Sequence, residues 1–312
     1  MRIIKHLTEI ERDEKTVITL GTFDGLHLGH QQIVNEVIKK SNQSNSRNFL
    51  VTFEPHPRKV IPGRNEVKLL STLDEKIEIL ENLGLKNLFV VNFTMEFSKQ
   101  SPEEFVKKYL IEGIGLSEIV IGYDHHFGKG RDGDFELLQN MGDKYNFSVT
   151  LISEYSVDGE IISSTKIRNA LLSGDVAKAG IMLGRNYSFK GTVVRGDGRG
   201  RKLGFPTANL SVDSEDKLIP AKGIYAAECV VENEKNYGLL SLGSRPTFHD
   251  DGRIVPEFYI FDFDRDIYDE EMKVEMVEKI RDEEKFKSVE DLVDQMKNDE
   301  AVGRKILSKL IN

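Results

Sequence analysis

The chain changes character near its middle, and that change restricts the folds that its 312 residues can adopt. In the first half, short runs rich in Val, Ile and Phe alternate with segments of helical period. Runs that are apolar along their whole length are typical of strands buried on both faces of a sheet. The five runs are TVITL (16–20), NFLVTF (48–53), LFVVNF (88–93), EIVIG (118–122) and FSVTLIS (147–153). Strands that alternate with helices predict parallel β-α-β connections and an open α/β sheet.

Two of the segments between these runs carry helix signals. Leu73, Ile77 and Leu80 recur at spacings of four and three, which places them on one face of a helix. Ser101 and Pro102 supply a cap and a first turn ahead of a second such pattern. Both helices are expected to pack an apolar stripe against the sheet.

After about residue 185, strand-like runs follow one another with glycine-rich turns and no helix between them. These runs are YSFKGTVV (187–194), IYAAECVV (224–231), YGLLSL (237–242), EFYIFDF (257–263) and MKVEMVE (272–278). Their order predicts an antiparallel barrel or sandwich, followed by a final helix capped at Ser288. A prior of about 150 residues per domain agrees with two domains. We expect them at residues 1–184 and 185–312.

Composition and charge exclude several classes of protein. Lys and Arg total 43 against 52 Asp and Glu, a net charge of −9 that argues against a general nucleic-acid binder. No window approaches 18 consecutive apolar residues, and the first residues lack the pattern of a signal peptide. The single cysteine, Cys229, leaves no intramolecular disulfide and no multi-cysteine zinc site. We therefore expect a cytoplasmic protein, monomeric or weakly oligomeric, without nucleic-acid or membrane partners.

The segment GTFDGLHLGHQ (21–31) directly follows the first predicted strand. Gly21 and Gly25 permit a tight turn, and a helix that starts near His27 places His27 and His30 one turn apart. A helix N-terminus at the carboxyl end of a parallel strand receives anions well. Two imidazoles at that point can donate hydrogen bonds to a phosphate whose charge grows in the transition state. The segment thus predicts electrostatic catalysis at a phosphate.

Two other interpretations of the histidine pair stay open. Histidines at positions i and i+3 can bind a metal, and His125 and His126 would add ligands. Such pairs also occur by chance on half-exposed helix surfaces. The flanking glycines and the position after the first strand favour the phosphate interpretation.

Two motifs of the first half resemble the signatures of a known superfamily. HLGH (27–30) is similar to the H-x-G-H signature of nucleotidylyltransferases, and SSTKIR (163–168) is similar to their S-S-T-x-I-R signature. The two serines can cap a helix whose N–H groups hold phosphates, and the arginine lies one turn further along. The resemblance implies a Rossmann-like domain in which His27 and His30 are catalytic. It also implies contacts to the ATP phosphates from Gly21, Phe23, Ser164, Thr165 and Arg168.

Two further segments are similar to the flavin-binding elements of bacterial bifunctional riboflavin kinase/FMN adenylyltransferases. They are FEPHP (53–57) and the loop GYDHHFGKGRDGD (122–134). The prolines of FEPHP give a rigid, extended edge suited to a flat ring, although a strand-ending turn would look the same. The loop has His125 and His126 where the family usually has aromatic and basic residues. The resemblance implies flavin contacts from Phe53, Pro55, His56, Pro57 and Asp124.

The segment GTVVRGDGRGRKLGFPTANL (191–210) combines glycines with basic residues. A loop of this kind can cradle phosphates through its backbone N–H groups, although a flexible solvent loop would have the same composition. Thr207 and Asn209 alternate onto one side of an extended strand. Their side-chain oxygens are of the type that Mg²⁺ accepts beside phosphates.

This segment resembles the riboflavin kinase signature of the same family. The resemblance implies that Thr207 and Asn209 hold Mg²⁺ and ATP, and that Glu257 is the base toward the ribityl 5′-hydroxyl. Taken without the resemblance, Glu257 would be an ordinary surface glutamate of a strand. The resemblance also implies a Greek-key type β-barrel and a flavin contact from Arg281. It implies further ATP contacts from Gly191, Lys202 and Gly204.

We therefore predict a bifunctional enzyme of FAD biosynthesis. Its barrel would phosphorylate riboflavin to FMN with ATP, and its α/β domain would transfer an adenylyl group from ATP to FMN, giving FAD and pyrophosphate. Two alternatives remain: a nucleotidylyltransferase for another small phosphate ester, or a flavin-binding regulator or transport-associated protein with one retained activity. The second is motivated by departures from the family pattern at His125, His126, Ser241 and Asp269.

Overall fold

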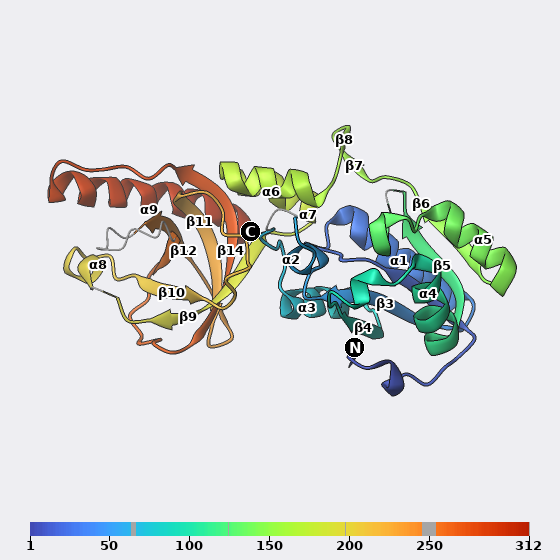
Figure 1. Cartoon of the computed structure of the whole chain (residues 1–312). Coiled ribbons are helices and arrows are strands. Elements are labelled where there is room, and N and C mark those ends of the chain that lie inside the picture. Colours follow the sequence, from blue (N-terminus) through green and yellow to red (C-terminus); the bar gives the residue numbers. More distant parts are fainter. Residues whose placement is uncertain (64–66, 124, 197, 245–253, 312) are drawn as a thin grey trace. The chain divides into compact units, whose positions relative to one another are not determined.

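The protein forms two compact units (Figure 1), Met1–Ser164 and Thr165–Asn312. The computed structural model describes residues 1–63, 67–123, 125–196, 198–244 and 254–311. The division by contacts falls ahead of the expected boundary after residue 184. It does so because α7 (Val176–Leu183) packs on two strands of the second unit.

The first unit is built on a parallel sheet of six strands, in the order β1-β4-β3-β2-β5-β6. All five predicted strands are present, and a short strand at the N-terminus adds a sixth. The strands are β1 (Arg2–Ile4), β2 (Thr16–Leu20), β3 (Arg47–Glu54), β4 (Asn87–Asn92), β5 (Leu116–Gly122) and β6 (Ser148–Ile152). The order reverses between β2 and β5, and ligands of open α/β sheets bind at the carboxyl ends of strands at such a point.

Helices cover both faces of this sheet. Val34 of α1 and Leu80 of α3 pack on one face, whereas Leu110 and Leu138 pack on the other. The helices are α1 (Leu28–Gln43), α2 (Pro57–Val60), α3 (Leu73–Leu83), α4 (Pro102–Phe105) with a π-helical continuation (Val106–Ile114), and α5 (Phe135–Tyr145). Short 3₁₀ turns lie at Leu7–Glu9, Phe97–Lys99 and Lys129–Arg131, and β7 (Ser156–Val157) pairs with β8 (Glu160–Ile161). The expected helices after residues 72 and 101 are confirmed, each with a capping box.

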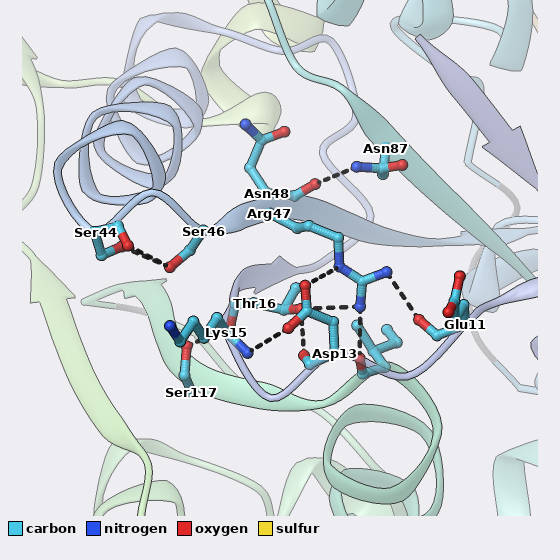
Figure 2. A network of polar contacts seen from close by, with 11 residues as sticks. Glu11, Asp13, Lys15, Thr16, Ser44, Ser46, Arg47, Asn48, Asn87 and Ser117 are labelled. Carbon is cyan, nitrogen blue, oxygen red and sulfur yellow. Dashed lines mark hydrogen bonds and ion pairs between the residues drawn. The ribbon is translucent and has the colours of Figure 1, made fainter.

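Arg47 ties together the amino ends of three strands (Figure 2). Its guanidinium donates to the main-chain oxygens of Glu11 at 2.8 Å and Ile114 at 3.0 Å. It also donates to Thr16 Oγ1 at 3.1 Å, and its Nε lies 3.2 Å from Asp13 Oδ2. Thr16 begins β2, and Arg47 begins β3. The network therefore stabilises the end of the sheet that lies away from the carboxyl ends of the strands.

The second unit contains a closed antiparallel barrel with the strand order β10-β13-β12-β11-β14-β9. The sequence pattern is compatible with a barrel or a sandwich, and the closed strand order shows that the fold is a barrel. The strands are β9 (Tyr187–Val194), β10 (Ala208–Val212), β11 (Gly223–Val231), β12 (Glu234–Ser244), β13 (Ile254–Ile260) and β14 (Glu271–Arg281). Phe189, Tyr225 and Phe258 are fully buried in the core, as is the Cys229 thiol on β11.

Four helices accompany the barrel in sequence. They are α6 (Ser164–Ser173), α7, α8 (Arg199–Lys202) and α9 (Val289–Ile311). Helix α9 packs on β11, β12 and β14, and Ser288 Oγ caps it by accepting from the Asp291 N–H at 3.0 Å. The predicted terminal helix is thus confirmed. Across the described ranges, no helix is both long enough and apolar enough to span a bilayer.

Candidate active sites

The loop after β2 turns the chain sharply into α1. Phe23 and Gly25 have φ angles of 46° and 82°, so the turn uses left-handed backbone that Gly25 adopts without strain. His27 caps the helix, because its Nδ1 accepts a hydrogen bond from the His30 backbone N–H at 3.3 Å. A side chain on Gly29 would lie 3.3 Å from the His27 ring, so glycine lets that ring approach the helix closely. The turn therefore fixes the position of the first histidine.

The His27 and His30 rings stack, with centroids 3.6 Å apart and an interplanar angle of 17°. Because His27 Nδ1 accepts a hydrogen bond, the proton of the neutral ring is on Nε2. His30 Nδ1 is buried and meets no hydrogen-bond partner in the described part of the chain. Burial, and then the neighbouring His27 and Lys76, lower the pKa of His30 well below its usual value. The Nε2–H of His27, beside a His30 ring whose pKa is lowered, suits an anion whose charge grows during reaction.

Asp24 connects this turn to distant segments of the first unit. Its Oδ1 accepts hydrogen bonds from the N–H groups of Leu70 at 2.9 Å and Ser71 at 3.2 Å. Ser71 Oγ in turn accepts from the Gly25 N–H at 3.0 Å. The main-chain oxygen of Asp24 accepts from Ser164 Oγ at 3.0 Å. The segments that contain the two nucleotidylyltransferase-like motifs therefore meet here, 140 residues apart in sequence.

The remaining residues expected around the ATP phosphates fall into two groups. Phe23 lies edge-on to His30 at 5.1 Å, and a side chain on Gly21 would lie 3.2 Å from the Phe23 ring. Thr165 and Arg168 lie on α6, beyond the point at which contacts divide the chain. Of these residues, Gly21 and Phe23 thus lie in the histidine turn itself.

Lys76 lies beside the histidine turn, although its position in α3 does not predict this. The residue is only 5% exposed, and its Nζ donates to the Thr22 main-chain oxygen at 2.7 Å and to Thr52 Oγ1 at 3.2 Å. Burial lowers the pKa of Lys76, against the opposing effect of Asp24 and Glu54. A charged residue on an amphipathic helix ordinarily faces solvent, so periodicity offers no signal for this contact.

Phe53 of the FEPHP segment lies in a group of aromatic rings at the carboxyl end of β3. Its centroid is 5.8 Å from that of Phe93 and 6.0 Å from those of Phe97 and Phe105. The group continues through Tyr109, which stacks on Phe105 at 5.3 Å. This aromatic cluster therefore lies at the carboxyl ends of the strands, as the histidine turn does.

The rest of the expected flavin elements are partly described. The Glu54–Pro55 peptide bond is cis, and His56 Nδ1 accepts from the Arg58 N–H at 3.2 Å as Pro57 begins α2. Asp124 lies outside the described residues.

The metal interpretation of the histidine pair has no support in the structure. Within the described ranges, no three His, Cys, Asp or Glu side chains gather where a metal ion could be held. The His125 ring instead stacks on Phe127, with centroids 5.5 Å apart. The described geometry therefore favours the phosphate interpretation.

In the barrel, three neighbouring strands bring polar side chains into one row. Glu257 on β13 lies directly opposite Asn209 on β10 and Ser241 on β12. Cross-strand partners point to the same face of a sheet. Phe258 and Leu240, which neighbour Glu257 and Ser241 in sequence, are fully buried. Since successive side chains alternate, the row faces outward from the barrel.

The glycine-rich segment packs against this row. A side chain on Gly196 would lie 2.1 Å from Asn209 Nδ2, and one on Gly200 would lie 2.3 Å from a main-chain oxygen. Asn209 is consequently only 7% exposed, although it points outward. Thr207, which directly precedes β10, donates from Oγ1 to Glu257 Oε2 at 3.3 Å. At these positions the segment is a packed cover rather than a flexible solvent loop.

The other expected ATP contacts of the barrel surround this segment. A side chain on Gly191 of β9 would lie 2.7 Å from the Ser211 main-chain oxygen. Gly204 has a φ of 85° and open space above its Cα. Lys202 ends α8, and its side chain is outside the described residues.

Arg281 is committed to a contact within the protein. Its Nε and Nη2 donate to both carboxylate oxygens of Asp299 at 2.7 to 3.0 Å, and its Nη1 donates to the Asp282 main-chain oxygen. Gln295 adds a further hydrogen bond to Asp299 at 2.8 Å. Arg281 thus fastens α9 to the end of β14.

Comparison with known proteins matches both halves of the chain. The FAD synthetase family model matches residues 9–166, and the riboflavin kinase family model matches residues 183–307. The bifunctional riboflavin kinase/FMN adenylyltransferase of Listeria monocytogenes is 40% identical over 96% of this chain and 94% of its own length. The Bacillus subtilis protein of the same description is 34% identical, over 96% of this chain and 95% of its own length.

A solved structure supports the fold of the whole chain. A Streptococcus pneumoniae protein described as a macrolide-efflux protein is 32% identical and covers 97% of this chain and 98% of its own, with a TM-score of 0.87. Two family matches in series and near-complete coverage of curated relatives agree with the two constellations described above. The chain therefore belongs to the family of bifunctional riboflavin kinase/FMN adenylyltransferases.

Proposed function

We propose that this chain makes FAD from riboflavin in two ATP-dependent reactions, one for each constellation. The first reaction phosphorylates riboflavin to FMN and releases ADP. The second transfers the adenylyl group of ATP to FMN and releases pyrophosphate. The observation that supports the proposal is that the chain has two separate groups of polar side chains, the stacked histidines and the outward row around Glu257.

In the adenylyl transfer, a phosphate oxygen of FMN attacks the α-phosphorus of ATP, and the bond to the pyrophosphate oxygen breaks. His27 and His30 donate from Nε2 to the α-phosphate oxygens, where negative charge grows. No covalent intermediate with the protein is required, because positioning and electrostatic stabilisation supply the rate. The remaining ATP phosphates contact Gly21, Phe23, Ser164, Thr165 and Arg168.

The flavin of the second reaction lies against the carboxyl end of β3. Phe53 and Phe97 are partly exposed and would contact an isoalloxazine ring, while Phe93 and Phe105 support them from the core. The proposed contacts are Phe53, Pro55, His56, Pro57 and Asp124.

In the kinase reaction, Glu257 accepts the proton of the ribityl 5′-hydroxyl as that oxygen attacks the γ-phosphorus of ATP. The bond between the γ-phosphorus and the oxygen of the leaving ADP breaks. The Thr207 hydroxyl, at 3.3 Å from the carboxylate, orients it for this role. Further contacts to ATP come from Gly191, Lys202 and Gly204, and Arg281 contacts the flavin or fixes the helix beside it.

Mg²⁺ is the metal that we propose for the kinase site. Its residues fit this ion, since Thr207, Asn209 and Glu257 offer only hard oxygen donors within one packed row. Thr207 and Asn209 would be the protein ligands. When bound, the ion neutralises charge on the ATP phosphates.

The kinase domain in this proposal is residues 185–312, and the adenylyltransferase domain is residues 1–184. We assign the chain to the cytoplasm, as a monomer or weak oligomer. Size-exclusion chromatography with light scattering measures the mass of the particle, and a stable higher oligomer contradicts the assignment.

One incubation tests the two activities. The purified chain is mixed with riboflavin, ATP and Mg²⁺, and the flavins are resolved by chromatography. We expect FMN and then FAD. His27→Ala reduces FAD formation by about 10²- to 10³-fold and leaves FMN formation intact. Glu257→Gln reduces FMN formation by about 10²- to 10⁴-fold and leaves adenylylation of supplied FMN intact.

The alternatives give different products in the same incubation. A nucleotidylyltransferase for another phosphate ester would leave supplied FMN unchanged. A flavin-binding regulator or transport-associated protein would form FMN alone, or would bind flavin and form neither product. Either result would overturn the proposed pair of activities.

A further inference from the structure

The buried lysine beside the histidine turn is a residue to which neither reaction assigns a role. We propose that Lys76 is a positioning residue of the adenylyl-transfer site: its ammonium fixes the turn that carries the histidines and keeps His30 an uncharged hydrogen-bond donor. The inference rests on the proposed adenylyl transfer at His27 and His30.

The ammonium group of Lys76 donates hydrogen bonds to two other segments of the first unit. Lys76 Nζ donates to the Thr22 main-chain oxygen at 2.7 Å, within the turn that begins after β2. It also donates to Thr52 Oγ1 on β3 at 3.2 Å, and that hydroxyl lies 3.4 Å from the same Thr22 oxygen. The lysine therefore joins α3, β3 and the histidine turn at one point. A shift of α3 would therefore also displace the turn.

Burial of the Lys76 ammonium group is energetically unfavourable by itself. An ammonium group removed from water is unfavourable unless it is paired and hydrogen-bonded, and an apolar side chain of the same length would pack there without that penalty. Lys76 is 5% exposed, and burial lowers its pKa, so the charged form depends on negative charge nearby. Asp24 from the turn and Glu54 from the end of β3 provide the compensating negative charge. The charge is thus supported by its surroundings.

The charge of Lys76 lowers the pKa of His30. Besides burial, two charged or chargeable groups lower the pKa of His30: His27, stacked at 3.6 Å, and Lys76 from α3. Phe23 presents only a ring edge to His30. Asp24 and Glu54 act on Lys76 itself. A positive neighbour disfavours a second positive charge, so Lys76 opposes protonation of His30. Protonation would also place an N–H at His30 Nδ1, which is buried and lacks an acceptor among the described residues.

Three variants separate charge from hydrogen bonding. Lys76→Met removes both and keeps the length of the side chain. Lys76→Gln keeps a donor without charge, and Lys76→Arg keeps the charge. Lys86→Met is the matched control, because Lys86 is exposed on the connection between α3 and β4 and its loss changes the net charge equally.

The His30 titration is measured by NMR on the full-length, histidine-labelled protein, with His30→Gln as the assignment reference. We expect its midpoint to rise by about one pH unit in Lys76→Met and Lys76→Gln, and to stay unchanged in Lys76→Arg and Lys86→Met. Adenylylation of supplied FMN falls about ten-fold or more in Lys76→Met, and its acid limb moves to higher pH. Riboflavin phosphorylation by the same samples is unchanged, and circular dichroism with a urea unfolding curve reports that the first unit, which contains Lys76, is folded.

The outcomes are distinct. A loss of adenylylation at every pH with an unmoved His30 midpoint would show a merely structural lysine and would overturn the inference. If Lys76→Met does not fold, equal midpoints in Lys76→Gln and Lys76→Arg overturn it as well. A wild-type protein that forms no FAD overturns the proposed function, whereas the midpoints still decide whether Lys76 controls His30.

Discussion

At the scale of single residues, the proposed kinase site has one hydroxyl beside one carboxylate. Thr207 Oγ1 donates to Glu257 Oε2 at 3.3 Å, so Thr207→Val keeps the shape of the side chain but leaves the carboxylate without this donor. We expect initial rates of FMN formation to fall about 10²-fold in Thr207→Val and by no more than about ten-fold in Thr207→Ser. Adenylylation of supplied FMN serves as the control. Equal FMN rates in wild type and Thr207→Val would remove Thr207 from the site.

The single cysteine permits a second prediction at this scale. Burial raises the pKa of the Cys229 thiol to about 12, so the thiol stays protonated at all lower pH values. An ordinary exposed thiol has a pKa of about 8.5 and reacts faster as the pH rises through that value. We expect iodoacetamide to alkylate the folded chain slowly and without acceleration between about pH 7 and 9. Intact-mass spectrometry measures the labelling, and the guanidinium-unfolded chain, which labels fully, is the control.

At the scale of elements, the Arg47 network joins the amino ends of strands, at the opposite end of the sheet from the histidine turn. Arg47→Met removes hydrogen bonds to Glu11, Ile114 and Thr16, and we expect the first unit to lose about 1–3 kcal/mol of stability. Lys15→Met, at an exposed neighbouring position, is the control. Urea unfolding followed by circular dichroism measures the change. Below the transition both activities should be retained, and a selective loss of FAD formation would contradict this structural role.

The attachment of α9 allows a second test among the elements. The Arg281–Asp299 pair is largely buried, with side-chain exposures of 16% and 3%, so breaking it should destabilise the second unit by about 3–5 kcal/mol. If Arg281 acts as the anchor of α9, Arg281→Ala and Asp299→Ala have similar unfolding midpoints. Their double variant then adds little further loss. If Arg281 contacts riboflavin, only its own replacement raises the KM for riboflavin.

The elements also show where sequence patterns suffice. Strands β2 to β6 could be predicted because each lies in a short run rich in Val, Ile, Leu or Phe. The expected burial on both faces is wrong for β6, which forms an edge of the sheet and has no buried residue. β1 could not be predicted, since Arg2–Ile4 buries only Ile4 and exists as a strand through its pairing with β4. The π-helical stretch Val106–Ile114 keeps an apolar stripe like that of an α-helix, so the pattern does not reveal its backbone hydrogen bonding.

The candidate sites follow the same division. The histidine pair could be predicted because its turn, cap and rings lie within one short motif. Lys76 could not, because its partners Thr52 and Thr22 are 24 and 54 residues away in sequence. The row around Glu257 depended on the register of three strands, which alternation alone does not determine.

At the scale of the whole molecule, two units with their own cores carry two proposed reactions in series. The His27→Ala chain should make FMN, and the Glu257→Gln chain should convert FMN to FAD. We therefore expect a mixture of the two variants to form FAD from riboflavin after a lag, because FMN has to leave one chain and enter another. Each variant alone, which should form little or no FAD from riboflavin, is the control. Absence of FAD from the mixture would mean that FMN does not pass between chains.

The outward row of Asn209, Glu257 and Ser241 has a further consequence for preparations of this protein. Because neighbouring side chains of a strand alternate, a slip of β13 by one residue would turn Glu257 inward and bring Phe258 to the surface. A barrel closed in that way would lack the proposed base at its site, so we expect it to be inactive rather than weakly active. The specific activity of riboflavin phosphorylation therefore counts the fraction of molecules whose strands have closed correctly, and serves as an assay of folding quality.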